Sequence, residues 1–273
     1  MKKKEKKSNV ARVILNVLII IVSCVLIFCI YKLGSIWWEY HSNQQTQEKV
    51  QDIFYGRAET SQAEVSGENS SGEQTAVTEG FSLKPVIDAN PDAVGWIKVE
   101  DTQIDYAVMQ GENNDQYLYT GFFGEENNAG SVFMDYRNTI GEPLQNLILY
   151  GHRMKDGSMF GELGDYLDYG FYQNHPQFTF ITEDGIYDCL VFSVYQCTTS
   201  VDYCQPVFSS AESMEKYIQD CKDRSIWQTP VSVTAEDTII TLSTCDYVLD
   251  PDEGRLVVHA KLQLRNESSE TNE

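Results

Sequence analysis

The apolar run Thr238-Ile239-Ile240-Thr241-Leu242-Ser243-Thr244-Cys245, which ends on a cysteine, is the stretch from which the fold can be worked out. β-Branched residues dominate it, and this composition favours a β-strand. Strand alternation puts Thr241, Ser243 and Cys245 on one face, opposite the apolar positions. The thiol of Cys245 therefore stands at the end of an apolar strand.

A second strand, Leu256–Leu264, is predicted after the loop Asp246–Gly254, and Arg255 stands at its start. If the two strands pair through this loop, Cys245 and Arg255 lie at its two feet on neighbouring strands. Such pairing would place a guanidinium beside a thiol. A buried structural cysteine near a surface arginine is the alternative, and it is the default for an isolated pair of this kind.

His152 is the histidine that best completes such a site. It follows the apolar run Leu147–Tyr150 and Gly151, at the point where a predicted strand enters a loop. Catalytic groups concentrate in loops that a rigid scaffold positions. His259 competes for this role, because strand alternation puts it on the same face as Arg255. The two remaining histidines lie in a polar loop and in the N-terminal segment.

A thiol, an imidazole and a guanidinium are the parts needed for acyl transfer through a thioester. In such a reaction Cys245 would attack a carbonyl, His152 would move protons and Arg255 would stabilise the oxyanion. A catalytically silent surface-binding module is the alternative. Reaction of Cys245 with a thiol-specific probe would distinguish an enzyme from that module.

Short strand signals dominate the folded region, which is expected to run from Phe81 to about Leu264. The predicted strands are Val94–Val99, Ile104–Val108, Ser131–Met134, Asn146–Tyr150, Gln177–Thr182, Tyr187–Tyr195, Thr238–Thr244 and Leu256–Leu264. The predicted helices are Ser210–Arg224, which Ser210 can cap, and the shorter Asn114–Tyr119 and Met159–Leu167. Many short strands with a few inserted helices predict a mainly β fold, a closed β-barrel of about eight strands.

The N-terminus predicts a membrane anchor. A lysine-rich cluster precedes Val13–Tyr31, which runs 19 residues without a charge, close to the roughly 20 apolar residues that span a bilayer. A cleaved signal peptide is the alternative, but its apolar core is shorter, about 7–15 residues, and ends in small residues. Here bulky residues follow, including Trp37 and Trp38, which suit a membrane interface. The positive-inside rule then places the N-terminus in the cytoplasm and the chain after Lys32 outside.

Four regions follow from this pattern. Residues 1–33 would form the cytoplasmic tail and transmembrane anchor, and residues 34–80 an extracellular stalk. The stalk would be helical over 35–58 and flexible over 59–80, which are rich in Ser, Glu and Gly. Residues 81–265 would form the catalytic domain, and 266–273 a disordered polar tail.

The charge is divided in agreement with this topology. Residues 1–33 hold seven of the 20 basic residues and one of the 41 acidic residues, so the remainder has 13 basic against 40 acidic residues, a net charge of −27. So acidic a region is a poor nucleic-acid binder, because contacts to phosphate need Lys and Arg. Nucleic acid is therefore excluded as a partner.

The chain has seven cysteines, two of them in the apolar span. The other five are an odd number, so at least one thiol outside the span stays free, and Cys245 is the candidate. The spacing forms no disulfide framework and leaves open whether Cys189, Cys197, Cys204 or Cys221 are paired. No CxxC pair or Cys/His cluster has zinc spacing, so a metal site is not expected. Acyl transfer through a thioester requires no organic cofactor either.

The chain resembles the sortases, cysteine transpeptidases of Gram-positive cell surfaces. Thr241–Cys245 matches the family's TLxTC signature, Gly254-Arg255 with the strand after it matches the arginine segment, and Leu149–His152 matches the histidine segment. The resemblance covers about Phe81 to Leu264 and is greatest to class B. That class has a helix between the two strands before the cysteine, as at Ser210–Arg224, and a helical N-terminal extension.

The resemblance implies a sortase-type barrel in which His152, Cys245 and Arg255 are catalytic. It also implies substrate-groove positions carried over residue by residue. These are Asn114, Leu118, Thr199, Tyr203, Ser243 and Asp246. Leu118 and Tyr203 could equally be ordinary packing residues.

The implied reaction cleaves a C-terminal sorting signal at threonine and transfers the acyl group from Cys245 to an amine of a peptidoglycan precursor. The implied partners are therefore surface proteins that carry such a signal, the precursor amine, and the membrane through the N-terminal helix. A pilin-polymerising transpeptidase with a lysine acceptor and a purely hydrolytic cysteine peptidase remain alternatives. An amine-dependent product separates the transpeptidases from the peptidase.

Overall fold

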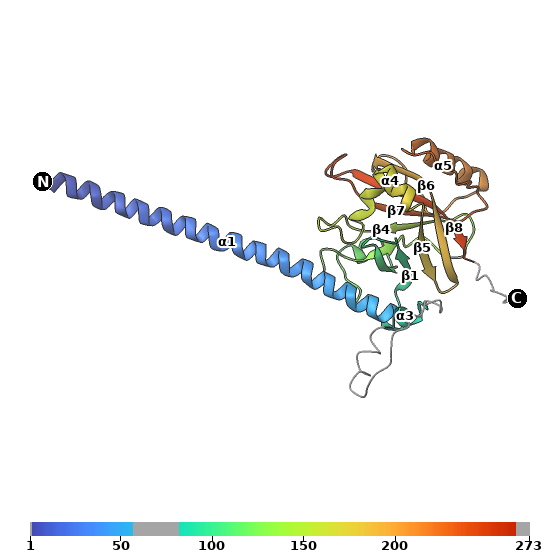
Figure 1. Ribbon diagram of the computed structural model, residues 1–273, viewed down its shortest axis with the longest axis horizontal. Coiled ribbons are helices and arrows are strands. Elements are labelled where there is room, and N and C mark those ends of the chain that lie inside the picture. Colours follow the sequence, from blue (N-terminus) through green and yellow to red (C-terminus); the bar gives the residue numbers. More distant parts are fainter. Residues whose placement is uncertain (1, 57–81, 266–273) are drawn as a thin grey trace, which may run out of the picture. The chain divides into compact units, whose positions relative to one another are not determined.

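The computed structural model describes residues 2–56 and 82–265, and the chain divides into two compact units after Gln45 (Figure 1). The first unit is the N-terminal part of helix α1 (Lys2–Phe54). The second unit holds the end of that helix and the rest of the described chain. The predicted flexible stalk over 59–80 and the predicted disordered tail over 266–273 lie outside the described residues.

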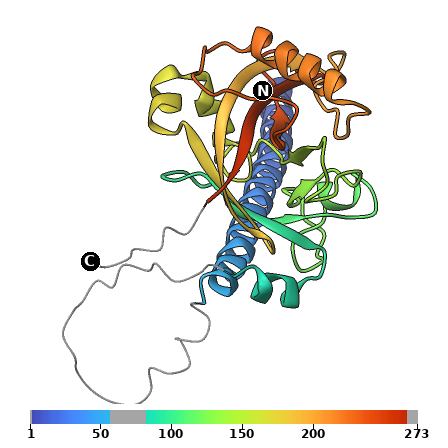
Figure 2. The same ribbon diagram turned by 90° about the vertical axis from the view of Figure 1, so that its right-hand side faces the viewer.

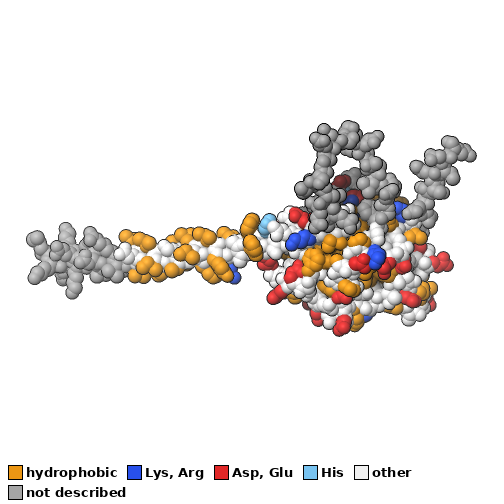
Figure 3. All heavy atoms as spheres, turned by 90° about the horizontal axis from the view of Figure 1, so that it is seen from below, with side chains coloured by type: hydrophobic (Ala, Val, Ile, Leu, Met, Phe, Trp, Pro, Cys, Tyr) orange, Lys and Arg blue, Asp and Glu red, His pale blue; other side chains and the backbone are white. Residues whose placement is uncertain are grey.

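Helix α1 is continuous through both the predicted anchor and the predicted helical part of the stalk. From Leu15 to Trp38 its large apolar side chains are exposed, and Figure 3 shows them along the helix. Within Leu15–Phe54 the helix is long and apolar enough to cross a membrane, by length and composition. Exposing so much apolar surface to water is unfavourable, and the hydrocarbon core of a bilayer can cover it. The helix therefore suggests association with a membrane.

Eight strands form a closed barrel in the order β1-β2-β3-β4-β7-β8-β6-β5. Their bounds are β1 Ala93–Lys98, β2 Asp105–Met109, β3 Val132–Met134, β4 Asn146–Tyr150, β5 Gln177–Thr182, β6 Gly185–Thr198, β7 Ile239–Cys245 and β8 Gly254–Leu264. Two of the pairs, β2 with β3 and β4 with β7, are parallel, and the others are antiparallel. Closure leaves no sheet edge unpaired.

The barrel has an apolar interior and a second apolar layer outside it. Alternation along β7 and β8 sends Leu242 and Val258 into the interior cluster and Ile239 and Val257 into the outer one. Helix α5 (Ala211–Arg224) covers this outer layer, as seen above the barrel in Figures 1 and 2. The chain between β6 and β7 thus covers the outer face of β7 and β8.

The end of α1 belongs to the core of the second unit. Val50 and Phe54 are buried in a third cluster with Trp96 of β1, and helix α3 (Lys84–Ala89) adds to it. The rings of Phe54 and Trp96 stack with centroids 4.0 Å apart, while the Tyr55 hydroxyl donates to both carboxylate oxygens of Asp105 at 2.9 Å. Residues 46–56 therefore fold with the barrel.

The predicted closed barrel of about eight strands is confirmed, and every predicted strand is present within a few residues of its expected bounds. Helix α5 begins after Ser210, whose side chain caps it. The two shorter predicted helices are 3-10 turns, η1 (Gln116–Leu118) and η2 (Glu162–Leu167). Helix α3 lies in the segment before Val94, where the resemblance implied a helical extension, whereas α4 (Tyr169–Asn174) was not predicted, because six-residue helices depend on packing more than on periodicity.

Candidate active site

Cys245 and Arg255 lie directly opposite each other on neighbouring strands. Cys245 is the last residue of β7, Arg255 is the second residue of β8, and the antiparallel register pairs the two. Directly opposed residues point to the same side of a sheet. The strand register therefore places the Arg255 guanidinium beside the Cys245 thiol, as the sequence predicted.

The loop between these strands returns tightly because of Gly254. The Asp246 backbone N–H donates to the Gly254 carbonyl at 2.8 Å. A Cβ at Gly254 would lie 2.0 Å from the Asp246 carbonyl oxygen, so only glycine fits there. Nη1 of Arg255 donates to the carbonyl oxygens of Gly254 at 2.8 Å and Asp252 at 3.3 Å. The loop backbone thereby orients the guanidinium.

His152 reaches the same edge through the parallel pairing of β4 with β7. The register pairs Tyr150 with Ser243, so the residues two positions further on, His152 and Cys245, come to the same end of the barrel. The hydroxyl of Thr244 donates to the Gly151 carbonyl at 2.8 Å and holds the two chain segments together beyond the strands.

The imidazole of His152 has a defined position. Its Nε2 is 2.8 Å from the Leu118 carbonyl oxygen, and its ring centroid is 5.7 Å from that of Tyr119. Because a carbonyl only accepts, Nε2 carries a hydrogen in this contact, and Nδ1 is the nitrogen that the contact leaves unused. One nitrogen thus fixes the ring while the other can exchange a proton.

These three side chains share one groove of about 310 Å³. It lies at the ends of β3, β4, β7 and β8, with one wall from the chain after β6 and another from the segment around η1. Its lining residues are Asn114, Asp115, Leu118, Phe133, Tyr150, Gly151, His152, Tyr203, Ser243, Thr244, Cys245 and Arg255. A groove that brings a thiol, an imidazole and a guanidinium together can position a carbonyl group for attack.

Four of the six positions predicted to bind substrate line this groove: Asn114, Leu118, Tyr203 and Ser243. The other two, both in the described part of the chain, do not. Thr199 is exposed at the end of β6, where its backbone N–H donates to the Glu253 carbonyl at 3.0 Å.

The side chain of Asp246, the second of these two, is 1% exposed and is used within the protein. It accepts hydrogen bonds from Arg153 at 3.0 Å and from Gln196, and also from the Val248 backbone N–H at 3.0 Å. Burial alone would raise the pKa of Asp246, but these hydrogen bonds outweigh burial and lower the pKa below its usual value. The carboxylate is therefore charged and engaged at neutral pH.

Several lining residues were not predicted from the sequence, notably Tyr150 and Phe133. Tyr150 directly precedes Gly151 and His152, so it could have been found from its place in the motif. Phe133 lies in β3, whose pairing with β2 and β4 decides that it faces the groove. Only the topology supplies that information.

His259 lies away from the groove. It is fully buried, with Nδ1 2.7 Å from the Thr241 hydroxyl and Nε2 3.0 Å from the Tyr195 hydroxyl. Burial lowers the pKa of His259 to about 3, so the ring is neutral in the folded protein. A buried neutral ring held by two hydroxyls is a structural histidine, and this favours His152 as the proton carrier.

The seven cysteines are all free thiols. Most of those in the second unit are buried, whereas Cys245 is not. Burial raises the pKa of Cys197 to about 11 and the pKa values of Cys204 and Cys221 to about 12, and it raises that of Cys189 as well. Cys245 is partly exposed in the groove. Of the described thiols outside α1, it is the one placed to meet a substrate.

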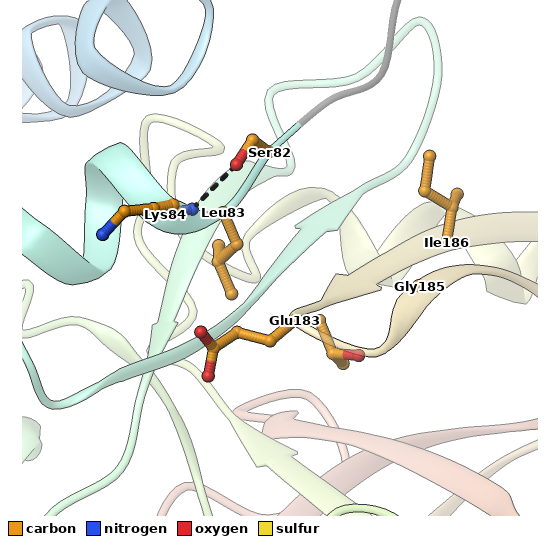
Figure 4. A pocket seen from close by; sticks show the side chains of 7 residues that line it. Ser82, Leu83, Lys84, Glu183, Gly185 and Ile186 are labelled. Carbon is orange, nitrogen blue, oxygen red and sulfur yellow. Dashed lines mark hydrogen bonds between the residues drawn. The ribbon is translucent and has the colours of Figure 1, made fainter.

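A second hollow, between the start of α3 and the β5–β6 turn, has no such chemistry. Residues at the start of α3 and in the β5–β6 turn line it, and Figure 4 shows Lys84 and Glu183 among them. Its lining contains no cysteine or histidine. In residues 2–56 and 82–265, no group of three or more His, Cys, Asp or Glu side chains is arranged to hold a metal ion.

Comparison with known proteins identifies this combination of barrel and groove. Residues 97–263 match the sortase domain family. Sortase B of Listeria monocytogenes is 37% identical over 247 residues, which cover 90% of this chain and 95% of that protein. The chain therefore belongs to the sortase family and is a cysteine transpeptidase of the sortase B type.

Solved structures agree with this assignment. A Staphylococcus aureus sortase B–substrate complex superposes with a TM-score of 0.70 at 33% identity and covers 84% of this chain and 100% of that one. A Bacillus anthracis protein described as similar to sortase B gives a TM-score of 0.69 at 40% identity, with 83% and 98% covered. The class B resemblance noted in the sequence is confirmed.

Proposed function

We propose that this transpeptidase cleaves a C-terminal sorting signal after threonine and joins the new carboxyl end to an amine of a peptidoglycan precursor. Surface proteins would thereby become anchored to the cell wall. The observation that carries this proposal is the meeting of Cys245, Arg255 and His152 at one end of the groove. Sortase B relatives at 37–39% identity support the reaction class.

In the first half-reaction, the Cys245 thiolate attacks the threonine carbonyl and an S–C bond forms. The tetrahedral oxyanion is stabilised by the Arg255 guanidinium, which is a fixed donor in the groove. The C–N bond then breaks, and His152 gives a proton to the leaving amine. The product of this step is a thioester between Cys245 and the threonine.

In the second half-reaction, His152 takes a proton from the incoming amine, which attacks the thioester carbonyl. The new C–N bond forms and the S–C bond breaks, so Cys245 leaves as the thiolate. Arg255 stabilises the second oxyanion as it did the first. No oxidant, reductant or net proton is consumed in the cycle.

The N-terminal helix would hold the enzyme in the membrane with its lysine-rich end in the cytoplasm and the groove outside the cell. The exposed apolar surface from Leu15 to Trp38 and the positive-inside rule support this orientation. We further propose that residues 1–33 only anchor the enzyme, and that catalysis resides in the barrel with its supporting helix. Protease added to intact cells should then digest the barrel and leave the N-terminal tail protected.

The test uses the full chain in detergent, a peptide library with threonine at one fixed position, and a small amine acceptor. Wild-type protein should form an amine-dependent product, and mass spectrometry should find a covalent adduct on Cys245. Cys245→Ala should abolish both, whereas Cys221→Ala, a buried thiol outside the groove, should keep most activity. An adduct that persists in Cys245→Ala, or a product that does not depend on the amine, would contradict the proposal.

A further inference from the structure

Asp135 is a buried carboxylate that lies beneath the groove without lining it. It follows β3 directly, and its side chain is 0% exposed. Its two oxygens accept five hydrogen bonds from three side chains and one backbone amide. Burying a charged carboxylate this deeply is unfavourable unless other groups compensate its charge. The role of Asp135 can therefore be inferred from the groups that donate to it.

Arg137 supplies the compensating charge. Its Nε and Nη2 donate to the two Asp135 oxygens at 2.8 Å each, and its backbone N–H donates at 3.0 Å. Burial would raise the pKa of Asp135, but the hydrogen bonds from Arg137, Asn114 and Tyr150 together lower the pKa below its usual value. The carboxylate is therefore charged at neutral pH and acts as an acceptor only.

Two residues that line the groove donate to the same Asp135 oxygen. Nδ2 of Asn114 donates at 2.9 Å and the Tyr150 hydroxyl donates at 3.0 Å. Asn114 comes from the loop before η1, while Tyr150 ends β4 beside His152. Asp135 thus joins two walls of the groove that are 36 positions apart in the sequence.

The amide of Asn114 is fixed at both ends. Its Nδ2 faces the Asp135 carboxylate, which can only accept, and its Oδ1 accepts from the Tyr136 backbone N–H at 3.0 Å. The two partners decide which end of the amide is nitrogen. The second Nδ2 hydrogen has no partner among the residues that the structure describes, so Asn114 can offer the groove a donor.

We propose that Asp135 is a positioning residue for substrate binding, which holds the Asn114 amide so that this subsite presents an N–H donor and accepts a peptide carbonyl oxygen. The proposal rests on the proposed function, because it takes the groove to be the peptide site. The sequence already led us to expect that Asn114 binds substrate. The proposal adds that Asp135, outside the groove, positions Asn114, and that Asn114 acts there as a hydrogen-bond donor.

A purely structural role makes a different prediction. If Asp135 only closes the turn after β3, its loss should lower stability and leave the binding of peptide unchanged. Asp237→Asn is the matched control, because Asp237 pairs with Lys261 at 2.8 Å and accepts the Thr234 backbone N–H at 2.9 Å, away from the groove. It therefore reports what the loss of a paired carboxylate does by itself.

The experiment measures kcat, KM and thermal stability of the full chain for Asp135→Asn, Asn114→Ala, the double variant and Asp237→Asn. Asp135→Asn should raise KM about 3- to 10-fold, the size of one lost hydrogen bond, with a smaller change in kcat. The double variant should be no worse than Asn114→Ala. Independent, multiplying effects on KM, or a KM for Asp135→Asn that matches Asp237→Asn, would overturn the proposal.

Asn114→Asp tests the polarity, because it offers an acceptor where the wild type offers a donor. It should bind peptide more weakly than Asn114→Ala, since two acceptors would then face each other. Binding as tight as that of the wild type would overturn the donor assignment. The rate at which a small thiol reagent modifies Cys245 should stay within about twofold of wild type in every variant, because no variant touches the thiol.

One measurement needs no substrate and so separates this proposal from the proposed function. In the full chain in detergent, the side-chain amide signal of Asn114 is identified by NMR from its loss in Asn114→Ala. Asp135→Asn should shift that signal and Asp237→Asn should not. An unmoved signal contradicts the positioning role, whereas a wild-type enzyme that joins no peptide to any amine contradicts the proposed function alone.

Discussion

Arg153 and Asp246 form an ion pair, Nη1 to Oδ1 at 3.0 Å, between the residue that follows His152 and the residue that follows Cys245. The pair joins the loop after β4 to the loop after β7 at the end where the groove lies. Its carboxylate is buried while its guanidinium is a quarter exposed, so solvent screens it only in part.

Breaking this pair should slow turnover without removing either reactive group. Asp246→Asn and Arg153→Gln should each lower kcat, because the segments that carry His152 and Cys245 lose a tether. Each should also cost about 1–3 kcal/mol of unfolding free energy, the usual cost of a buried group left without its charged partner. Steady-state kinetics and urea denaturation measure the two effects.

The double variant should be little worse than either single variant, because both remove one interaction. Asp88→Asn is the control, since it breaks the exposed Lys84–Asp88 pair and should change stability by less than about 1 kcal/mol. Full additivity in the Arg153 and Asp246 cycle would mean that the two side chains act separately.

Arg255 should be irreplaceable by lysine. The loss of one oxyanion donor costs on the order of 10²–10³ in rate, and a lysine ammonium lacks the planar fork that Gly254 and Asp252 orient. Arg255→Ala and Arg255→Lys should both show a large fall in kcat in the peptide assay. Cys245 should still react with a small thiol reagent. A near-normal rate for Arg255→Lys would mean that only positive charge is needed.

His259 should make folding stability depend on pH in one window. Its pKa is lowered from 6.5 to about 3, so between these values the unfolded chain binds a proton that the folded protein does not. Protonation then favours unfolding, and stability falls as the pH drops below about 6.5. His259→Gln should remove this slope, which can reach about 1.4 kcal/mol per pH unit. Denaturant titrations between pH 5 and 8 measure the unfolding free energy of the wild type and of His259→Gln. The two values should converge as the pH falls, and their difference should be constant above about pH 7.

Phe54 should be needed for the stability of the barrel although it lies in the helix that carries the anchor. Its ring stacks on Trp96 and is 6% exposed, so Phe54→Ala should cost about 3 kcal/mol or more. Lys49→Ala, on an exposed position of the same helix, should change stability by no more than about 0.5 kcal/mol. Thermal unfolding of the full chain in detergent compares them, and equal effects would contradict the docking of this helix end.

The parts of the site that could be predicted from the sequence are those fixed by a single strand pair. Alternation along β7 and a short loop were enough to bring Cys245 opposite Arg255. The parallel β4–β7 pair brings His152 beside them, and this pairing was reached through the family motif rather than through periodicity. The sequence favoured His152 over His259 through its place at a strand end and through the family motif, and the burial of His259 supports that choice.

The remaining features depend on contacts that no local pattern encodes. Asp246 is polar and follows the cysteine, which favours a groove position, yet Arg153 and Gln196 draw its side chain inward. The apolar positions of the helix end, such as Val50 and Phe54, were visible in the sequence. Their docking depends on where Trp96 lies after the barrel has closed. Tertiary packing thus determined where the Asp246 side chain and the end of α1 lie, which local sequence propensity does not specify.

The parallel pairing of β4 with β7 has a consequence for how such enzymes can diverge. The thiol and the imidazole meet through sheet register, although 92 residues separate them in the chain. Insertions in the exposed turn around Thr199 and Ser200, which comes shortly before the lining residue Tyr203, would therefore change one side of the groove without shifting the reacting pair. New selectivity can arise there by indels, while the chemistry is inherited unchanged from the barrel.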